Sequence, residues 1–594
     1  MKQVSAQYAA SMASLLRNRS SVRVRFENVN PYAAKDGTWI SNGEMPCSDV
    51  LTLDVAHEYG KPYATLEENR WMLDGEYRIY PSSLSASDGY ISKQISNEQG
   101  FFEENPVITR EFSQERPLIG LTLTFDKSTQ EWPLEFALRM YDGAGNSIFS
   151  QTAQPKSAEV YIETETLNVK KIEIEFLSML PYRRARLESV MYGIARVFTN
   201  DEIQETEQSH DVDPISRRLP QESFAFTIID YEHEYDPENP RGAYEFIDRY
   251  APVSIQYGNE LPDGTTEWLK ADRYKLSGKP SVSRDIARFS ATGLLGSMTG
   301  KYYKSTVGSK SLYDMAVSVL EDADLAPTPD GEDPWIIDES LKNILTNAVL
   351  PIDTHANCLQ LIAHAACMKL YTDDDNVIHI DSGTDTDAEP EFVIDFNSFK
   401  DGSPVVSKIP SLRAVVVSKY SYATAGGSSE IYKGTTSEET VHVEFSGLAE
   451  NVYISVSGGT VVSREIYGRA ADLTLSGSGN KTITITGTQL QEGSIDKTVT
   501  FGADGEISEV KNPLITNDQM AEAVAQHVGS YLMNRSTYDA EYRGNPELEV
   551  GDVIAIQTRY SDAVKGLVLC DAIKFNGAIS GSLKVKVIGG EQNA

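Results

Sequence analysis

Two histidine–cysteine pairs are the residues whose spacing most suggests chemistry. They are His355-x-x-Cys358 and His364-x-x-Cys367, a spacing that zinc ligands often have. On one helix the members of each pair lie about 60° apart, but the two pairs face roughly opposite sides. Four ligands placed in this way cannot close a tetrahedron around a metal ion. We therefore interpret these side chains as the packed face of a helix, and we expect no metal and no cofactor.

Acidic loops are the second group of candidates. The run Asp373-Asp-Asp-Asn376 lacks the alternating carboxylates and distant glutamate of a calcium loop, so it is interpreted as a hairpin turn. Asp142 and Asn146 lie in the loop Tyr141-Asp-Gly-Ala-Gly-Asn146 and are better placed to contact a cation or a sugar. The turn preference of Asp-Gly alone also explains that loop.

Catalytic signatures are not found in the sequence. It contains no Gly-x-Ser-x-Gly elbow, no His-Glu-x-x-His zinc helix and no phosphate-binding lysine loop. A carboxylate pair for glycoside cleavage stays open, because its separation is a property of the folded chain. We predict that the protein is not an enzyme.

The charge balance limits the partners. With 87 acidic against 53 basic residues the net charge is −34, which disfavours a groove that grips nucleic acid. An acidic wall would suit DNA only in transit, and the acidity could equally serve solubility alone. The sequence has no apolar run long enough to span a bilayer and no signal peptide. We expect synthesis in a bacterial host cytoplasm and no stable membrane insertion.

The elements that position these residues are mostly strands. Alternation such as Val22-Arg-Val-Arg-Phe26 and frequent turns predict a mainly β, multidomain α+β protein. Amphipathic helices are expected at 311–323, 354–368 and 517–533, the first two with an N-cap. The predicted domains are a first barrel (1–75 with 193–298), an inserted jelly-roll-like β-sandwich (76–192), a small α/β domain (299–405), a second barrel (406–434 with 506–594) and an inserted small β-sandwich (435–505).

The C-terminal part carries a family resemblance. It reads Asn512-Pro-Leu-Ile515, then a helix packed on a small antiparallel barrel, then Arg543-Gly-Asn-Pro546 and Leu548-Glu-Val-Gly-Asp-Val-Ile554. This pattern resembles the tail tip or baseplate hub proteins that close the tail tube of bacteriophages, including phages of Gram-positive hosts. The resemblance implies two hub-type barrels per chain and a homotrimer.

The segment 76–192 carries a second resemblance. Phe101-Phe-Glu-Glu-Asn-Pro-Val-Ile108 and Pro181-Tyr-Arg-Arg-Ala-Arg-Leu187, set among short strands, are similar to the discoidin-type jelly roll of carbohydrate-binding modules. That likeness implies sugar contacts from loop aromatic and polar side chains. The candidates for contact with glycan or a partner are Tyr90, Phe101, Phe102, Trp132, Asp142, Asn146, Tyr182, Arg183 and Arg184.

Together these features predict a structural virion protein at the distal end of a phage tail. Its expected partners are the tail tube and distal tail proteins, the tape measure protein, other tip or receptor-binding proteins, and host-surface glycan. Two alternatives stay open. One is a secreted or surface glycan-active enzyme with carbohydrate-binding modules, and the other is the hub of a non-viral contractile injection particle.

Overall fold

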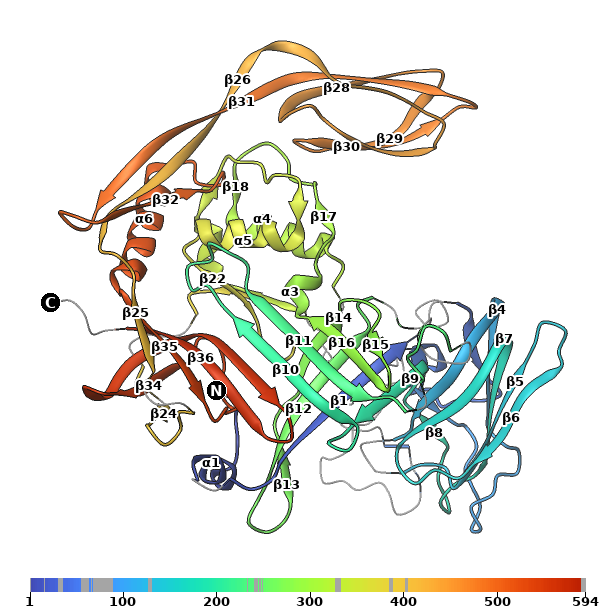
Figure 1. Ribbon diagram of the computed structural model, residues 1–594. Coiled ribbons are helices and arrows are strands. Elements are labelled where there is room, and N and C mark those ends of the chain that lie inside the picture. Colours follow the sequence, from blue (N-terminus) through green and yellow to red (C-terminus); the bar gives the residue numbers. More distant parts are fainter. Residues whose placement is uncertain are drawn as a thin grey trace.

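The computed structural model describes most of the chain and is mainly β (Figure 1). The described residues are 2–14, 17–29, 36–54, 64–65, 67, 89–126, 131–231, 233–239, 244, 247, 249–325, 333–383, 388–390, 392–400 and 404–588. Among them, no helix is both long and apolar enough to cross a membrane.

A curved antiparallel sheet forms the centre of the molecule. In β1 (Ser20–Val29) the side chains of Val22, Val24 and Phe26 are buried, so the predicted alternation is confirmed. The hydrogen-bonded path runs from β9 through β1, β12, β14, β16 and β11 to β10. Its other strands are β9 (Ser189–Phe198), β10 (Ile203–Asp211), β11 (Gln221–Ile229), β12 (Pro252–Glu260), β13 (Thr266–Trp268), β14 (Asp272–Leu276), β15 (Ser281–Ser283) and β16 (Ile286–Thr292).

The C-terminal strands continue this sheet. Strand β10 pairs with β35 from Thr206↔Phe575 to Asp211↔Cys570, and the connected strands include a closed barrel. One hydrophobic cluster fills both halves, with Phe289 on one side and Val585 on the other. The C-terminal strands are β24 (Phe392–Ile394), β25 (Val405–Lys408), β33 (Ser536–Tyr542), β34 (Val553–Thr558), β35 (Ser561–Phe575) and β36 (Ile579–Val587).

The first inserted sandwich begins earlier than we predicted. Strand β2 (Thr38–Ser41) pairs with β4 (Val107–Thr124), and Trp39 is buried in the sandwich core, so 38–41 belong to the insert and not to a barrel. The pairing of β4 with β9 joins the insert to the central sheet. Its other elements are a 3-10 helix (Val50–Asp54), β3 (Tyr90–Ile91), β5 (Glu135–Tyr141), β6 (Ser147–Ala153), β7 (Glu159–Ser178) and β8 (Arg186–Leu187).

The predicted mixed α/β region is present. Its two helices, α4 (Leu312–Asp322) and α5 (His355–Ala365), begin where the hydroxyls of Ser311 and Thr354 accept backbone N–H hydrogen bonds. The rest comprises α3 (Leu294–Ser297), β17 (Lys301–Tyr302), β18 (Lys310–Ser311), β19 (Trp335–Ile337), a 3-10 helix (Glu339–Asn343), β20 (Leu345–Thr346), β21 (Asp353–Thr354), β22 (Lys369–Thr372) and β23 (Ile378–Asp381). Residues 392–394, which we assigned to this domain, instead pair with β34.

The segment 412–511 differs most from the prediction. Strand β26 (Leu412–Thr436) pairs with β31 (Lys481–Thr500) and β32 (Glu506–Lys511), so 412–434 are not part of a barrel. Together β26 and β31 form a long ribbon that arches above α4 and α5 to a small distal sandwich (Figure 1). That sandwich adds β27 (Thr440–Glu444), β28 (Ala449–Ser457), β29 (Thr460–Ile466) and β30 (Ala470–Ser476).

The C-terminal helix was predicted correctly in extent but not in packing. Helix α6 (Asp518–Met533) begins after Asn517, whose side chain accepts the N–H of Met520. Its buried face, including Val524 and Val528, joins the cluster made by α4, α5 and the base of β26, and not the barrel core. At the other end of the chain, α1 (Ala6–Ala13) is a short helix capped by Ser5.

Candidate functional site

The paired histidines and cysteines are divided among separate contacts. His355 Nε2 lies 2.9 Å from Asp322 Oδ2, whereas His364 lies 3.3 Å from the side-chain nitrogen of Asn512. Burial raises the pKa of the Cys358 thiol to about 12 and that of Cys367 to about 11, so neither is a ready thiolate. Within the described part of the chain, no group of three or more potential ligands could hold a metal ion.

The acidic turns stabilise their own loops. Asp373 accepts the N–H groups of Asp375 and Val377, which closes the predicted hairpin between β22 and β23. Asp142 accepts the N–H groups of Ala144 and Asn146, and the Asn146 amide donates to its second oxygen at 3.0 Å. These bonds, with the Asn146 side chain first, lower the pKa of Asp142. Asn146 is exposed and Asp142 is half-buried at the tip of the β5–β6 hairpin.

One end of the first sandwich gathers most of the predicted aromatic contacts. Phe101 and Tyr182 expose 56% and 38% of their surfaces there, beside exposed Leu180 and Leu134. Backbone bonds hold these loops together: Met179 N–H donates to Gly100 O at 2.9 Å, and Leu134 N–H to Ser178 O at 3.0 Å. The pairing of Tyr141 with Lys171 at the far end of β5 places Asp142 and Asn146 away from this surface.

The charged residues at this end are fixed by neighbours. Arg183 Nε donates to Glu131 Oε1 at 3.0 Å, and the backbone N–H of Arg183 donates to Ser96 Oγ at 2.9 Å. Trp132 is half-buried against the sandwich core. This end of the sandwich is therefore an apolar, aromatic surface beside the Arg183 guanidinium, which a hydrogen bond holds in place. Surfaces of this kind bind sugar rings.

Three of the predicted contact residues are buried instead. Tyr90 has no exposed surface, Phe102 exposes 8%, and both pack in the sandwich core. Arg184 exposes 9%, and its guanidinium donates to the backbone carbonyls of Ser92 and Lys93. These side chains hold the fold together and offer no surface to a ligand in this structure.

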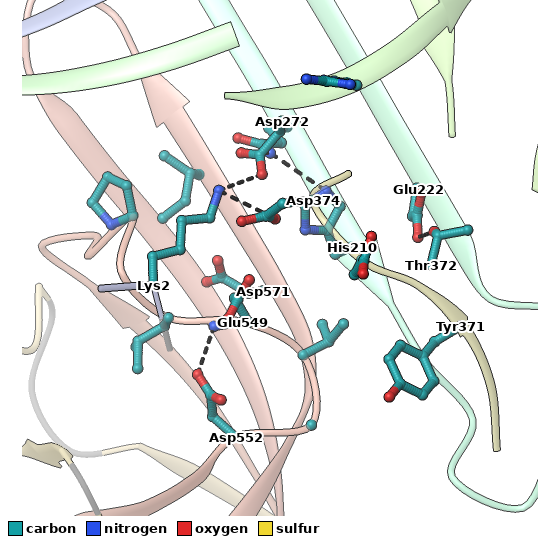
Figure 2. A pocket seen from close by; sticks show the side chains of 18 of the residues that line it. Lys2, His210, Glu222, Asp272, Tyr371, Thr372, Asp374, Glu549, Asp552 and Asp571 are labelled. Carbon is teal, nitrogen blue, oxygen red and sulfur yellow. Dashed lines mark hydrogen bonds and ion pairs between the residues drawn. The ribbon is translucent and has the colours of Figure 1, made fainter. Parts of the chain in front are cut away.

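A polar cavity of about 210 Å³, which the sequence did not suggest, lies where the N-terminal segment, the central sheet and the α/β domain meet. Figure 2 shows Lys2 pointing into it toward Asp272 of β14 and Asp374 of the β22–β23 turn. The backbone N–H of Lys2 also donates to Glu547 O at 2.8 Å, which attaches the segment to the C-terminal strands. Gln208 Nε2 donates to Asp272 and Tyr274, and Glu222 accepts from Thr372.

The charged groups that line this cavity, here called the polar joint, interact electrostatically. Burial opposes ionisation of Asp272, but Lys2 and His210 lower its pKa. For Asp374 burial wins, with nearby Asp272 adding to it, and the pKa rises to about 7. Burial likewise raises the pKa of Asp571 to about 8. The Lys2 ammonium therefore balances part of a carboxyl cluster contributed by separate parts of the fold.

Comparisons with known proteins find tail proteins among the solved structures that are similar to this chain. No protein-family model and no curated protein matches it significantly. A tail protein from Neisseria meningitidis MC58 is 8% identical, with a TM-score of 0.38 over 66% of this chain and 93% of its own. A type VI secretion component from E. coli is 8% identical, with a TM-score of 0.31 over 66% of this chain and 74% of its own.

A smaller protein is similar over part of the chain. A fucose-binding module from Streptococcus pneumoniae is 13% identical, with a TM-score of 0.19 over 28% of this chain and 98% of its own. The structural neighbours thus include phage tail proteins, the class that the C-terminal motifs resemble, and a carbohydrate-binding module.

Proposed function

We propose that this protein is a structural hub of a phage tail tip, which closes the distal end of the tail tube as a homotrimer. The observation that carries the proposal is the joining of two strand groups through β10 and β35 over one hydrophobic core. Two barrels joined in this way would form one stiff unit, as a ring component must be. Three such chains would supply six barrels around a central passage.

The polar joint supports the same role. Lys2 connects the N-terminal segment to β14 and to the β22–β23 turn, while its backbone N–H holds the C-terminal strands. Contacts among buried polar groups fix geometry, because each one loses its partner if the parts slide. A ring that docks on a tube and on other tip proteins needs that fixed geometry.

The net charge of −34 fits a passage for DNA. Acidic walls repel phosphates, so DNA would move through the ring without adhering to it. In this proposal DNA is a transient passenger, and the stable partners are the tail tube, the distal tail proteins, the tape measure protein and receptor-binding proteins of the tip.

The first sandwich is proposed as the module that the hub presents to host-surface glycan or to a neighbouring tip protein. It lies to one side of the central sheet, away from the α/β domain (Figure 1). Its exposed aromatic end, with Phe101 and Tyr182 beside Arg183, is the surface that would contact a sugar. Hydrogen-bonded Asp142 and Asn146 would be a separate contact at the opposite end.

The solution mass of the purified chain tests the hub proposal. Sedimentation equilibrium should give about three times the 65.6 kDa of one chain, and the assembly should bind purified tail-tube protein. A monomer at all accessible concentrations, with no affinity for the tube, would refute the ring.

Substitutions at the aromatic end test the glycan proposal. Phe101→Ala and Tyr182→Asn should each weaken binding to host cell-wall polysaccharide roughly tenfold, because each removes an exposed ring. Asparagine suits the second position because Tyr182 has φ +58°, a conformation that asparagine tolerates. Tyr560→Ala, which removes an exposed ring from the β34–β35 hairpin, is the matched control. Equal binding by the wild type and all three variants would show that the glycan contact lies elsewhere.

A further inference from the structure

A second cavity, of about 510 Å³, lies between α6 and the outer face of the C-terminal strands. Lys565 and Leu567 of β35 and Lys586 of β36 line one wall, and His527 and Tyr531 of α6 line another. Leu567 pairs with Lys586, and Lys565 is two residues away from Leu567, so both lysines project from the same face of the sheet. The volume suits a small organic molecule.

Lys586 is buried, and no ion pair joins it to another residue that the structure describes. Its residue is 4% exposed, and its Nζ lies 4.3 Å from the centroid of the Tyr531 ring. Lys369, at the border with the polar joint, is 7% exposed and lies against the Tyr371 ring in the same way. Neither lysine forms an ion pair with a carboxylate in the part of the chain that the structure describes. Burying an unpaired ammonium is costly, so such a group normally has a function.

His527 adds an unsatisfied nitrogen. Its Nε2 is buried and has no hydrogen-bond partner among the described residues. Burial also lowers the pKa of His527 and lowers that of Lys586 to about 8, although nearby Asp213 acts in the opposite direction on both. The Asp213 carboxylate does not line the cavity, and it accepts the backbone N–H groups of Ile215, Arg217 and Arg218.

The sign of the charge is unusual for this chain. The protein carries 34 more negative than positive charges, yet the charged side chains that line this cavity are lysines. An anion in this cavity would lie near the Lys586 ammonium. The His527 ring could donate an N–H hydrogen bond to the same anion, in its neutral or its protonated form. Ile215, Leu567 and Ile588 also line the cavity, beside the polar Ser382, Ser530 and Asn534, and could contact a short carbon skeleton.

We propose that this cavity binds a small organic anion through its phosphate or carboxylate group, with Lys586 as the main counter-charge and His527 as a second hydrogen-bonding group. The ligand would occupy the space between α6 and β36 and would supply the partner that Lys586 lacks. This site is independent of the hub proposal and of the glycan surface.

Calorimetric titration of the full chain with two probes, inorganic phosphate and glutarate, tests the site. At matched ionic strength at least one probe should bind with a dissociation constant of millimolar or tighter. Binding of phosphate alone would assign a phosphate group, and binding of glutarate alone would assign a carboxylate. If neither probe gives more heat than a chloride control, the proposal is overturned.

The variant Lys586→Met distinguishes a specific anion-binding site from nonspecific attraction of anions to positive charge. This substitution keeps the length of the side chain and removes an unpaired buried charge, so the protein should fold and bind at least tenfold more weakly. Lys584→Met is the matched control, because Lys584 lies on the same strand and the same face but outside the cavity. Where circular dichroism shows that Lys586→Met does not fold, Lys565→Gln replaces it. Wild-type affinity in the folded cavity variant would refute the assignment.

Discussion

Buried polar side chains in this protein mostly contact partners from distant parts of the sequence. Arg110 has a fully buried side chain and binds Asp54, and its guanidinium carbon lies 4.9 Å from the centroid of the Tyr192 ring. His355 binds Asp322 on the neighbouring helix. These residues therefore fix tertiary geometry, and the histidine–cysteine spacing that first suggested a metal is a consequence of helix packing.

His364 gives a prediction about pH. Burial, with help from Arg217 and His527, lowers its pKa from 6.5 to about 4 in the folded chain. Because the unfolded chain binds the proton more readily, stability is retained above pH 6.5 and is lost as the pH falls toward 4. At pH 4.5 the loss should be about 2–3 kcal/mol.

Denaturant unfolding, monitored through hydrogen exchange of the backbone amides in α5, measures this loss of stability. Relative to pH 7, wild type should lose more stability at pH 4.5 than His364→Gln, which cannot take up the proton. His233→Gln is the control, since the His233 side chain is 48% exposed. The same pH dependence in wild type and His364→Gln would contradict the prediction.

At the scale of single elements, local signals were sufficient for the helices. Ser311 and Thr354 each cap a helix as the sequence predicted, because capping depends on residues within one turn, and Asn517 caps a third helix. Strand partners were harder to infer. The pairing of β2 with β4 joins residues about seventy positions apart, and nothing in Thr38–Ser41 itself identifies that partner.

The candidate site likewise contains residues that local sequence identifies and residues that it does not. Phe101 and Tyr182 lie in turn-rich segments, and the structure exposes them as loop residues. Tyr90 lies in a strand of two residues, too short for alternation to show which face is buried. Lys2 and Lys586 could not be found from sequence, because their environments are assembled from segments hundreds of residues apart.

Helix α6 gives a prediction in which two local effects oppose each other. Alanine at position 529 would gain about 1 kcal/mol of helix propensity over glycine. Its Cβ, however, would lie 1.9 Å from Cζ of Phe501, which packs over this face of the helix. We expect the clash to dominate, so Gly529→Ala should lower the free energy of unfolding by about 1–3 kcal/mol.

Urea unfolding compares this variant with Ser530→Ala, an exposed position on the same helix that should be nearly neutral. The double variant Gly529→Ala with Phe501→Val should recover part of the lost stability, since the smaller side chain makes room. A stabilised Gly529→Ala protein would mean that α6 does not pack tightly on Phe501.

At the scale of the whole molecule, the chain has a central sheet and two outlying sandwiches (Figure 1). The distal sandwich touches the α/β domain where Tyr303 OH donates to Asp472 Oδ2 at 3.1 Å, and the Tyr303 and His442 ring centroids are 4.2 Å apart. Gly468 N–H also donates to Ser305 O at 2.8 Å, and the β26–β31 ribbon connects this sandwich to the rest of the chain. In the proposed hub, both sandwiches would be the parts that meet partners.

Imaging of the assembled particle tests the central claim most directly. Electron microscopy of purified phage labelled with an antibody against the distal sandwich should show three copies in a ring at the distal end of the tail tube. Label along the tube, at the head-proximal end, or missing from the particle would contradict the account.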